Sequence, residues 1–115
     1  MKKQFRLKKS EDFKKVLDKR HCAGKNDSIS VFYSPNEIDH ARIGISVSSK
    51  VGNAVTRATI RRQIRAQINL TDIIKQSYDI VIIARKGYLE KTFQENTKLL
   101  ENCFSRILKS KEDNA

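Results

Sequence analysis

The sequence has little of several residue types, and each shortage excludes a class of protein. One proline and four glycines among 115 residues exclude collagen-like and proline-rich disordered chains. Two cysteines, Cys22 and Cys103, are too few for a disulfide framework. The longest apolar stretch, residues 80–84, falls far short of the roughly 18 residues that span a membrane. Because no apolar signal region follows the basic N-terminus, we expect a cytosolic protein with one domain, residues 1–115, and no membrane partner.

Acidic residues are also scarce, and their distribution is uneven. Against 13 Asp and Glu stand 24 Lys and Arg, a net charge of +11, which is expected where the partner is an anion such as nucleic acid. The stretch between Asp39 and Asp72 holds six basic residues and no acid. The first twenty residues hold nine basic and three acidic groups, whereas residues 86–115 hold six and five. The N-terminal and central segments are therefore the predicted anion-binding surface, and the C-terminal segment is predicted scaffold.

The apolar pattern predicts an α+β fold with the element order α-β-β-α-β-α. We expect a compact sandwich in which three helices pack on a small, mostly antiparallel sheet. Ser10 can cap the first helix, which places Phe13, Val16 and Leu17 on one face. Residues 19–27 are predicted to form a loop. The predicted strands are residues 29–33, 41–48 and 78–85, and the other predicted helices run from Thr56 to about Ile68 and from Leu89 to Leu108.

The predicted central helix carries an arginine stripe beside an apolar face. Its apolar face is formed by Ile60, Ile64 and Ile68, and its stripe by Arg57, Arg61 and Arg65, with Arg62 further round. No glutamate stands four residues away to pair with the stripe. All four are arginine although the chain has 15 lysines and 9 arginines, and the guanidinium fork binds phosphate through two bonds. The pattern therefore favours phosphate binding over a merely solvated face.

Two further features bear on nucleic-acid binding. Residues 50–53, Lys-Val-Gly-Asn, precede the stripe helix and could direct backbone N–H groups at a phosphate. Phe13, Phe32 and Tyr33 are candidate stacking platforms for single-stranded nucleic acid. Strand alternation places Phe32 and Tyr33 on opposite faces. A core role for all three aromatic residues is equally compatible with the sequence.

Residues for protein-based catalysis are missing from the pattern. No Ser, His and carboxylate set and no pair of carboxylates at strand ends stands out, so the sequence offers no nucleophile or general base. Four possible metal ligands, His21, Cys22, His40 and Cys103, lack the paired close spacing of zinc sites. Any chemistry is expected to come from the bound nucleic acid or a metal ion.

Residues 51–65, VGNAVTRATIRRQIR, closely resemble the signature of the bacterial ribonuclease P protein subunit. That family has Gly-Asn-Ala-Val, then Arg-Asn, a Lys/Arg-Arg pair and a further Arg. The resemblance extends to residues 6–13, 42–48 and 79–85 in the same order. The chain departs from the family pattern at Ala58, where Asn is usual, at Ser49, where Lys is usual, and at Leu17, where an aromatic residue is common.

The resemblance implies a small basic partner of a catalytic RNA that removes the 5′ leader of precursor tRNA. The RNA would perform the hydrolysis with Mg²⁺, held by the RNA and the substrate, and the protein would contain no catalytic residue. The implied partners are the RNA subunit, in a 1:1 ribonucleoprotein, and precursor tRNA, with no protein partner. The implied fold contains a left-handed β-α-β crossover around the arginine helix.

Site residues follow from the same resemblance. The implied RNA-binding residues are Lys50, Asn53, Arg57, Arg61, Arg62 and Arg65. The implied cleft for the single-stranded leader is lined by Phe13, Lys14, Leu17 and Tyr33. Two alternatives remain at this level: a ribosomal or RNA-chaperone protein that assists no cleavage, and a protein-only nuclease, which the missing carboxylate cluster and catalytic histidine disfavour.

Overall fold

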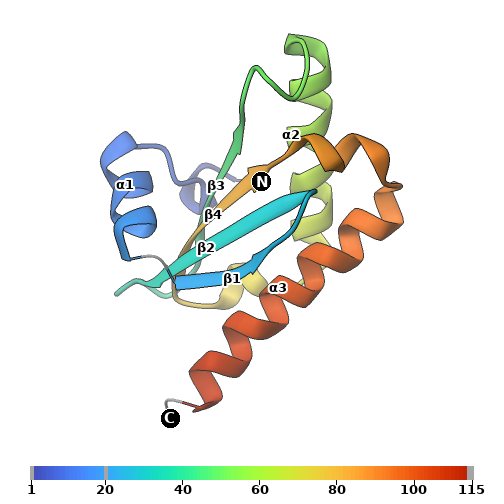
Figure 1. The fold of residues 1–115 in the computed structure, drawn as a ribbon. Helices are drawn as coiled ribbons and strands as arrows, with labels where there is room; N and C mark the ends of the chain where they lie inside the picture. Colours follow the sequence, from blue (N-terminus) through green and yellow to red (C-terminus); the bar gives the residue numbers. More distant parts are fainter. Residues whose placement is uncertain (1, 20, 114–115) are drawn as a thin grey trace.

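The computed structural model describes residues 2–19 and 21–113 of the chain. Within them, three α-helices and a four-stranded sheet form an α+β fold (Figure 1). In chain order the elements are α1 (Ser10–Lys19), β1 (His21–Lys25), β2 (Ile29–Pro35), β3 (Arg42–Val47), α2 (Ala54–Asn69), β4 (Tyr78–Ala84) and α3 (Phe93–Asp113). Short 3-10 helices lie at Lys3–Phe5, Ile73–Lys75 and Lys86–Glu90. No helix in these residues is both long and apolar enough to cross a membrane.

The sheet is mostly antiparallel, as predicted, with the strand order β1-β2-β4-β3. β2 pairs antiparallel with β1 and with β4, whereas β3 pairs parallel with β4. Because β3 and β4 are parallel neighbours, α2 belongs to a β-α-β crossover between them. The left-handed sense of that crossover stays a prediction. In the parallel pair, Arg42 lies opposite Asp79 and Gly44 opposite Val81.

The sheet separates a large core from a small one. Figure 1 shows α1 on one side of the sheet and α3 running across the other. The large core contains isoleucines of the sheet, Ile43, Ile80 and Ile82, packed against Ile60 and Ile64 of α2 and Ile107 of α3. The small core lies under α1 and contains Leu7, Val16 and Val81, with Phe13, Leu17, Phe32 and Ile83 packed against it. β4 is central and covered on both faces, which explains its nearly continuous apolar sequence.

Strand β1 corrects the prediction of a loop over residues 19–27. Its sequence, His-Cys-Ala-Gly-Lys, lacks the branched and aromatic residues that favour strands. Contacts from the distant helix α3 hold it in place: Arg106 Nη1 donates to the Ala23 carbonyl at 3.0 Å. Cys103 lies so close to Gly24 that a side chain there would overlap its Sγ atom. Tertiary packing therefore overrides the local propensity.

Two helix starts also differ from the predictions. α2 begins at Ala54 rather than Thr56 because the Asn53 side chain caps it, accepting a bond from the Thr56 N–H at 2.9 Å. α3 begins at Phe93 rather than Leu89. Thr92 and Glu95 form a capping box there: Glu95 N–H donates to Thr92 Oγ1 at 3.1 Å, and Thr92 N–H donates to Glu95 Oε1 at 3.0 Å. Leu89 is consequently exposed and precedes the helix.

Candidate nucleic-acid interface

The four arginines of α2 project beside its buried isoleucines, as the helical spacing predicts. Ile60, Ile64 and Ile68 are buried in the large core. Arg57, Arg61 and Arg65 are half-buried on the neighbouring flank, and Arg62 is exposed. α2 contains no acidic residue. Among the described residues, none of these arginines forms an ion pair.

Two of the stripe guanidinium groups contain a buried nitrogen without a hydrogen-bond partner. These atoms are Nε of Arg57 and Nε of Arg65. Burial lowers the pKa of Arg65, and the nearby positive charges of Arg6 and Arg61 lower it further. Leaving cationic donors unpaired and desolvated costs free energy. An anion bound to the exposed parts of these guanidinium groups would offset the mutual repulsion.

A hollow of about 200 Å³ joins the stripe to the N-terminal segment. Arg61 and Arg65 of α2 line it together with Arg6 and Lys8, which precede α1. Its remaining walls come from Phe13 and from β3 around Gly44. The backbone of Leu7 is tied to this strand, because its N–H donates to the Ile43 carbonyl at 3.1 Å. The two basic segments that are separate in the sequence therefore face one cavity.

The face of the sheet beneath α1 carries a second hollow. The Phe13 ring lies on the sheet at Gly44, and the second hollow, of about 420 Å³, is lined by Leu17, Asp18, Lys25, Phe32 and Ile83. We call these two hollows, together with the Phe13 ring that lines the first, the α1 groove. It has aromatic and aliphatic walls with charged groups at both ends, which suits a strand with exposed bases and a charged backbone.

The family model described as Ribonuclease P matches residues 1–108 of the chain. The chain belongs to the ribonuclease P protein family. It is thus a ribonuclease P subunit, and RNA binding and tRNA processing follow from this membership.

Relatives in this family match nearly the whole chain. The ribonuclease P protein component of Mesoplasma florum is 40% identical over 111 residues, which cover 95% of this chain and 100% of the relative. That of Bacillus pumilus is 44% identical over 109 residues, covering 92% and 90%.

Solved structures of ribonuclease P proteins share the fold. The Staphylococcus aureus protein superposes with a TM-score of 0.79 at 37% identity, covering 88% of this chain and 93% of that one. The Thermotoga maritima protein superposes with a TM-score of 0.77 at 27% identity, covering 88% and 96%. These likenesses confirm the α+β class and its three helices.

Tyr33 is not part of the α1 groove, which corrects its predicted place in the leader cleft. Its side chain packs against the large core on the opposite face of the sheet. There its ring lies 5.6 Å from the Tyr78 ring and 5.6 Å from the His21 ring. The neighbouring Phe32 lines the groove instead. Strand alternation predicts that the two rings diverge, but it does not reveal which one faces α1.

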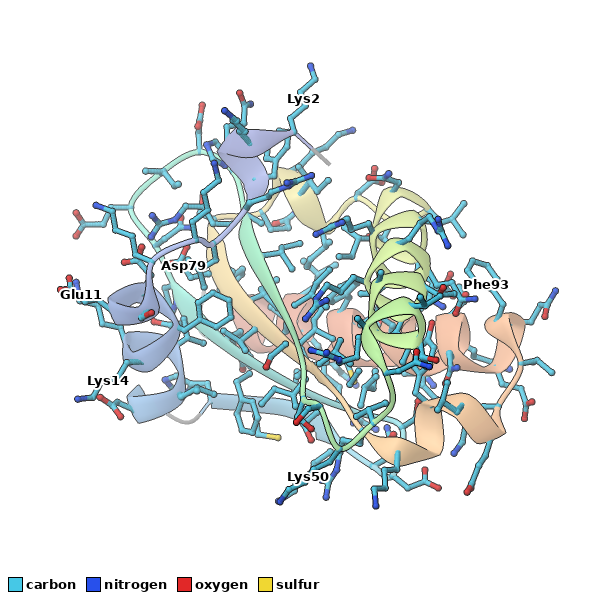
Figure 2. All side chains as sticks on the ribbon, turned by 90° about the horizontal axis from the view of Figure 1, so that it is seen from above. Lys2, Glu11, Lys14, Lys50, Asp79 and Phe93 are labelled. Carbon is cyan, nitrogen blue, oxygen red and sulfur yellow. The ribbon has the colours of Figure 1, made fainter. Side chains whose placement is uncertain are left out.

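Lys14 also lies outside the groove. It is exposed, and Figure 2 shows it projecting from the side of α1 that is turned away from the sheet. Of the four predicted cleft residues, the structure therefore brings together Phe13 and Leu17. Besides Arg61 and Arg65, the basic groups that line the two hollows are Arg6, Lys8 and Lys25.

The loop before α2 places its predicted RNA-binding residues at the rim of the stripe. Lys50 is exposed, and Figure 2 shows it pointing away from the body of the molecule. Asn53 has a structural role as well, because its Oδ1 caps α2. Ala58 is exposed in the first turns of α2, where its methyl group offers no hydrogen bond.

The candidate metal ligands form no cluster of three among the described residues. The His40 ring packs edge-on against Phe5, Cys22 is exposed, and Cys103 is buried. In this part of the chain, no three His, Cys, Asp or Glu side chains are grouped so that they could hold a metal ion.

Proposed function

We propose that this ribonuclease P subunit binds the catalytic RNA through the α2 arginines and the 5′ leader of precursor tRNA in the α1 groove. One observation carries the proposal: Arg61 and Arg65 line the same hollow as Phe13. An RNA strand that leaves the α1 groove at this hollow would directly contact the arginine stripe of α2. The two surfaces are therefore suited to binding a structured RNA and a single strand that adjoins it.

The two surfaces suit two kinds of RNA contact. A folded RNA presents mainly phosphates and ribose hydroxyls, because its deep groove hides the bases. Unpaired arginine forks on a rigid helix match that target. A single-stranded leader exposes its bases, which can stack on aromatic rings. Phe13 and Phe32 supply such rings in the α1 groove.

The hydrolysis itself is assigned to the RNA subunit in this proposal. Asp12 of α1 and Asp79 of β4 are both engaged by Arg42. His40 packs against Phe5, and His21 packs against Tyr33. Since no three His, Cys, Asp or Glu side chains among the described residues are grouped so that they could hold a metal ion, we place the Mg²⁺ ions on the RNA and the substrate. One protein would pair with one catalytic RNA in the cytoplasm.

A reconstitution assay tests the function. The protein, the catalytic RNA and precursor tRNA are mixed at low Mg²⁺, and each component is omitted in turn. We expect that the protein stimulates RNA-dependent cleavage and that the products have mature 5′ ends. Cleavage by the protein alone would instead support a protein nuclease. RNA binding without any stimulation would support an RNA chaperone.

The leader contact is tested by a second substrate comparison. The holoenzyme's affinity for precursor tRNA with a leader is compared with its affinity for tRNA that lacks one. We expect the protein to raise the affinity for leader-containing precursor tRNA more than the affinity for leaderless tRNA. The Phe13→Ala variant should lose that preference. Equal strengthening of both would contradict leader binding in the α1 groove while leaving the RNA-binding role of α2 in place.

A further inference from the structure

Helix α1 forms one wall of the groove and rests on the sheet through a short apolar face. It has ten residues, and helices this short are marginal in water without tertiary support. Its apolar contacts come from Phe13, Val16 and Leu17. Before the helix, the Leu7 N–H bond to the Ile43 carbonyl ties the chain to β3, and the Phe13 ring packs closely on Gly44. Apolar contacts have little directionality, so a polar contact within α1 itself adds a directional restraint on where Phe13 lies.

Arg42 of β3 is held in one orientation by Asp79 of β4. Arg42 Nε donates to Asp79 Oδ1 at 2.9 Å, and Nη2 donates to Oδ2 at 2.7 Å. Asn36 Nδ2 also donates to Asp79 Oδ1, at 3.0 Å. The side chain of Asp79 is only 14% exposed. Such a two-bond fork fixes the guanidinium plane, leaving Nη1 of Arg42 directed elsewhere.

The remaining nitrogen faces α1. Arg42 Nη1 lies 3.8 Å from Asp12 Oδ2, and the Asp12 side chain is 19% exposed. Asp12 immediately precedes Phe13, and Arg42 lies two residues before Gly44 on the same face of β3. Figure 2 shows Asp79 near the chain that enters α1, whereas Glu11 points outward. The ion pair thus joins the first turn of α1 to the strand on which the Phe13 ring lies.

We propose that Asp12 and Arg42 are positioning residues that set the place of α1 over the sheet and hence the place of Phe13 in the groove. The inference rests on the proposed leader binding for its functional consequence. Asp79 holds Arg42 in one orientation, and the ion pair between Arg42 and Asp12 positions the helix relative to β3. Neither residue needs to touch the leader for this effect.

The test compares two variants that remove the same charge from the same helical turn. Asp12→Asn weakens the link to Arg42, and Glu11→Gln is the matched control because Glu11 is exposed and has no partner among the described residues. Both variants alter net charge and the helix N-terminus alike. We expect Asp12→Asn to lower the holoenzyme's preference for leader-containing over leaderless tRNA by about two- to fivefold relative to Glu11→Gln, the range of a partly exposed ion pair. Affinity for the catalytic RNA should be equal in the two variants.

A direct readout of the ring position accompanies the affinities. The Phe13 ring current should shift the Gly44 Hα signals upfield in NMR spectra of the wild type and Glu11→Gln. Asp12→Asn should reduce that shift, and Asp12→Glu should retain much of it because a carboxylate still faces Arg42. Thermal unfolding of each variant confirms that the compared proteins are folded.

Several results would overturn the inference. One is equal behaviour of Asp12→Asn and Glu11→Gln in both readouts, and another is an equal loss of affinity for the catalytic RNA and the leader, which indicates general destabilisation. A Gly44 signal that moves without any change in leader preference would also overturn it. If the wild type shows no leader preference at all, the proposed function fails, and the Gly44 signal alone decides the positioning role.

Discussion

The phenyl ring of Phe13 in α1 lies directly against the backbone of Gly44 in β3. A Cβ atom at Gly44 would overlap three atoms of the ring. The missing side chain therefore provides the space in which the ring lies, at the wall of the first hollow of the α1 groove. This contact links a glycine in the sheet to the shape of the candidate leader site.

Replacing Gly44 with alanine should displace the Phe13 ring. We expect Gly44→Ala to destabilise the fold by about 1–3 kcal/mol, as overpacking does, and to weaken leader binding more than binding of the catalytic RNA. Urea unfolding and the leader-dependent affinity measure the two effects. Ser46→Ala, an exposed position two residues along β3, is the control. Unchanged stability and leader affinity in Gly44→Ala would show that the Phe13 ring can adopt another position at no cost.

Removing two stripe arginines should flatten the salt dependence of RNA binding. Each phosphate contact on duplex contributes roughly 0.9 to the slope of log affinity against log salt, and less on single strands. We expect Arg61→Ala with Arg65→Ala to reduce the slope by about 1–2 units. Lys98→Ala with Lys109→Ala removes the same charge from exposed positions of α3 and should change the slope little. Equal slopes for the two double variants would exclude the stripe from the interface.

The arginine stripe was predictable from sequence because its geometry is local. Helical periodicity alone places Arg57, Arg61 and Arg65 beside Ile60 and Ile64, and the structure confirms this arrangement. The same holds for the α+β class, since each long element has a clear apolar period. Local spacing is a property of the helix and needs no knowledge of its neighbours.

Strand β1 and the place of Tyr33 could not be predicted for the opposite reason. Helices cover both faces of β2, so Phe32 and Tyr33 both face apolar surroundings, and alternation cannot reveal which face holds α1. β1 depends on Arg106 and Cys103, about eighty residues away in the chain. Such long-range contacts are invisible in a local pattern. The hollow shared by Arg6 and Arg65 was missed for the same reason.

A buried hydrogen-bond network orients α2, and the stability of the fold should depend on its Tyr88 hydroxyl. Tyr88 Oη donates to Gln63 Oε1 at 2.9 Å and accepts from Gln67 Nε2 at 3.2 Å. Tyr88→Phe leaves both amides without this partner, and Gln67 is fully buried. We expect a loss of about 1–3 kcal/mol in unfolding free energy, the cost of unsatisfied buried groups, measured by urea denaturation. No loss would mean that water replaces the hydroxyl.

The capping box of α3 should make stability depend on pH. Bonds from the Thr92 backbone and side chain lower the pKa of Glu95 below its usual value. A lowered folded-state pKa contributes stability above the unfolded pKa, and this contribution is lost as pH falls through the folded pKa. Between about pH 6 and pH 3, the wild type should therefore lose more stability than Glu95→Gln. Thr92→Ala should cost about 1 kcal/mol at neutral pH. Parallel pH curves for wild type and Glu95→Gln would contradict the cap.

Arg65 should show a conflict between stability and binding. Its guanidinium is partly desolvated, lies near the charges of Arg6 and Arg61, and has an Nε atom without a partner. Arg65→Met keeps an apolar stem and removes the charge, so the free protein should become more stable at low salt while its RNA affinity falls. The gain should shrink at high salt, because salt screens the repulsion that the substitution relieves. Arg62→Met removes the same charge from an exposed position and should change stability less. Denaturant unfolding at two ionic strengths measures the effect, and a destabilised Arg65→Met at low salt would show that its guanidinium stabilises the free protein.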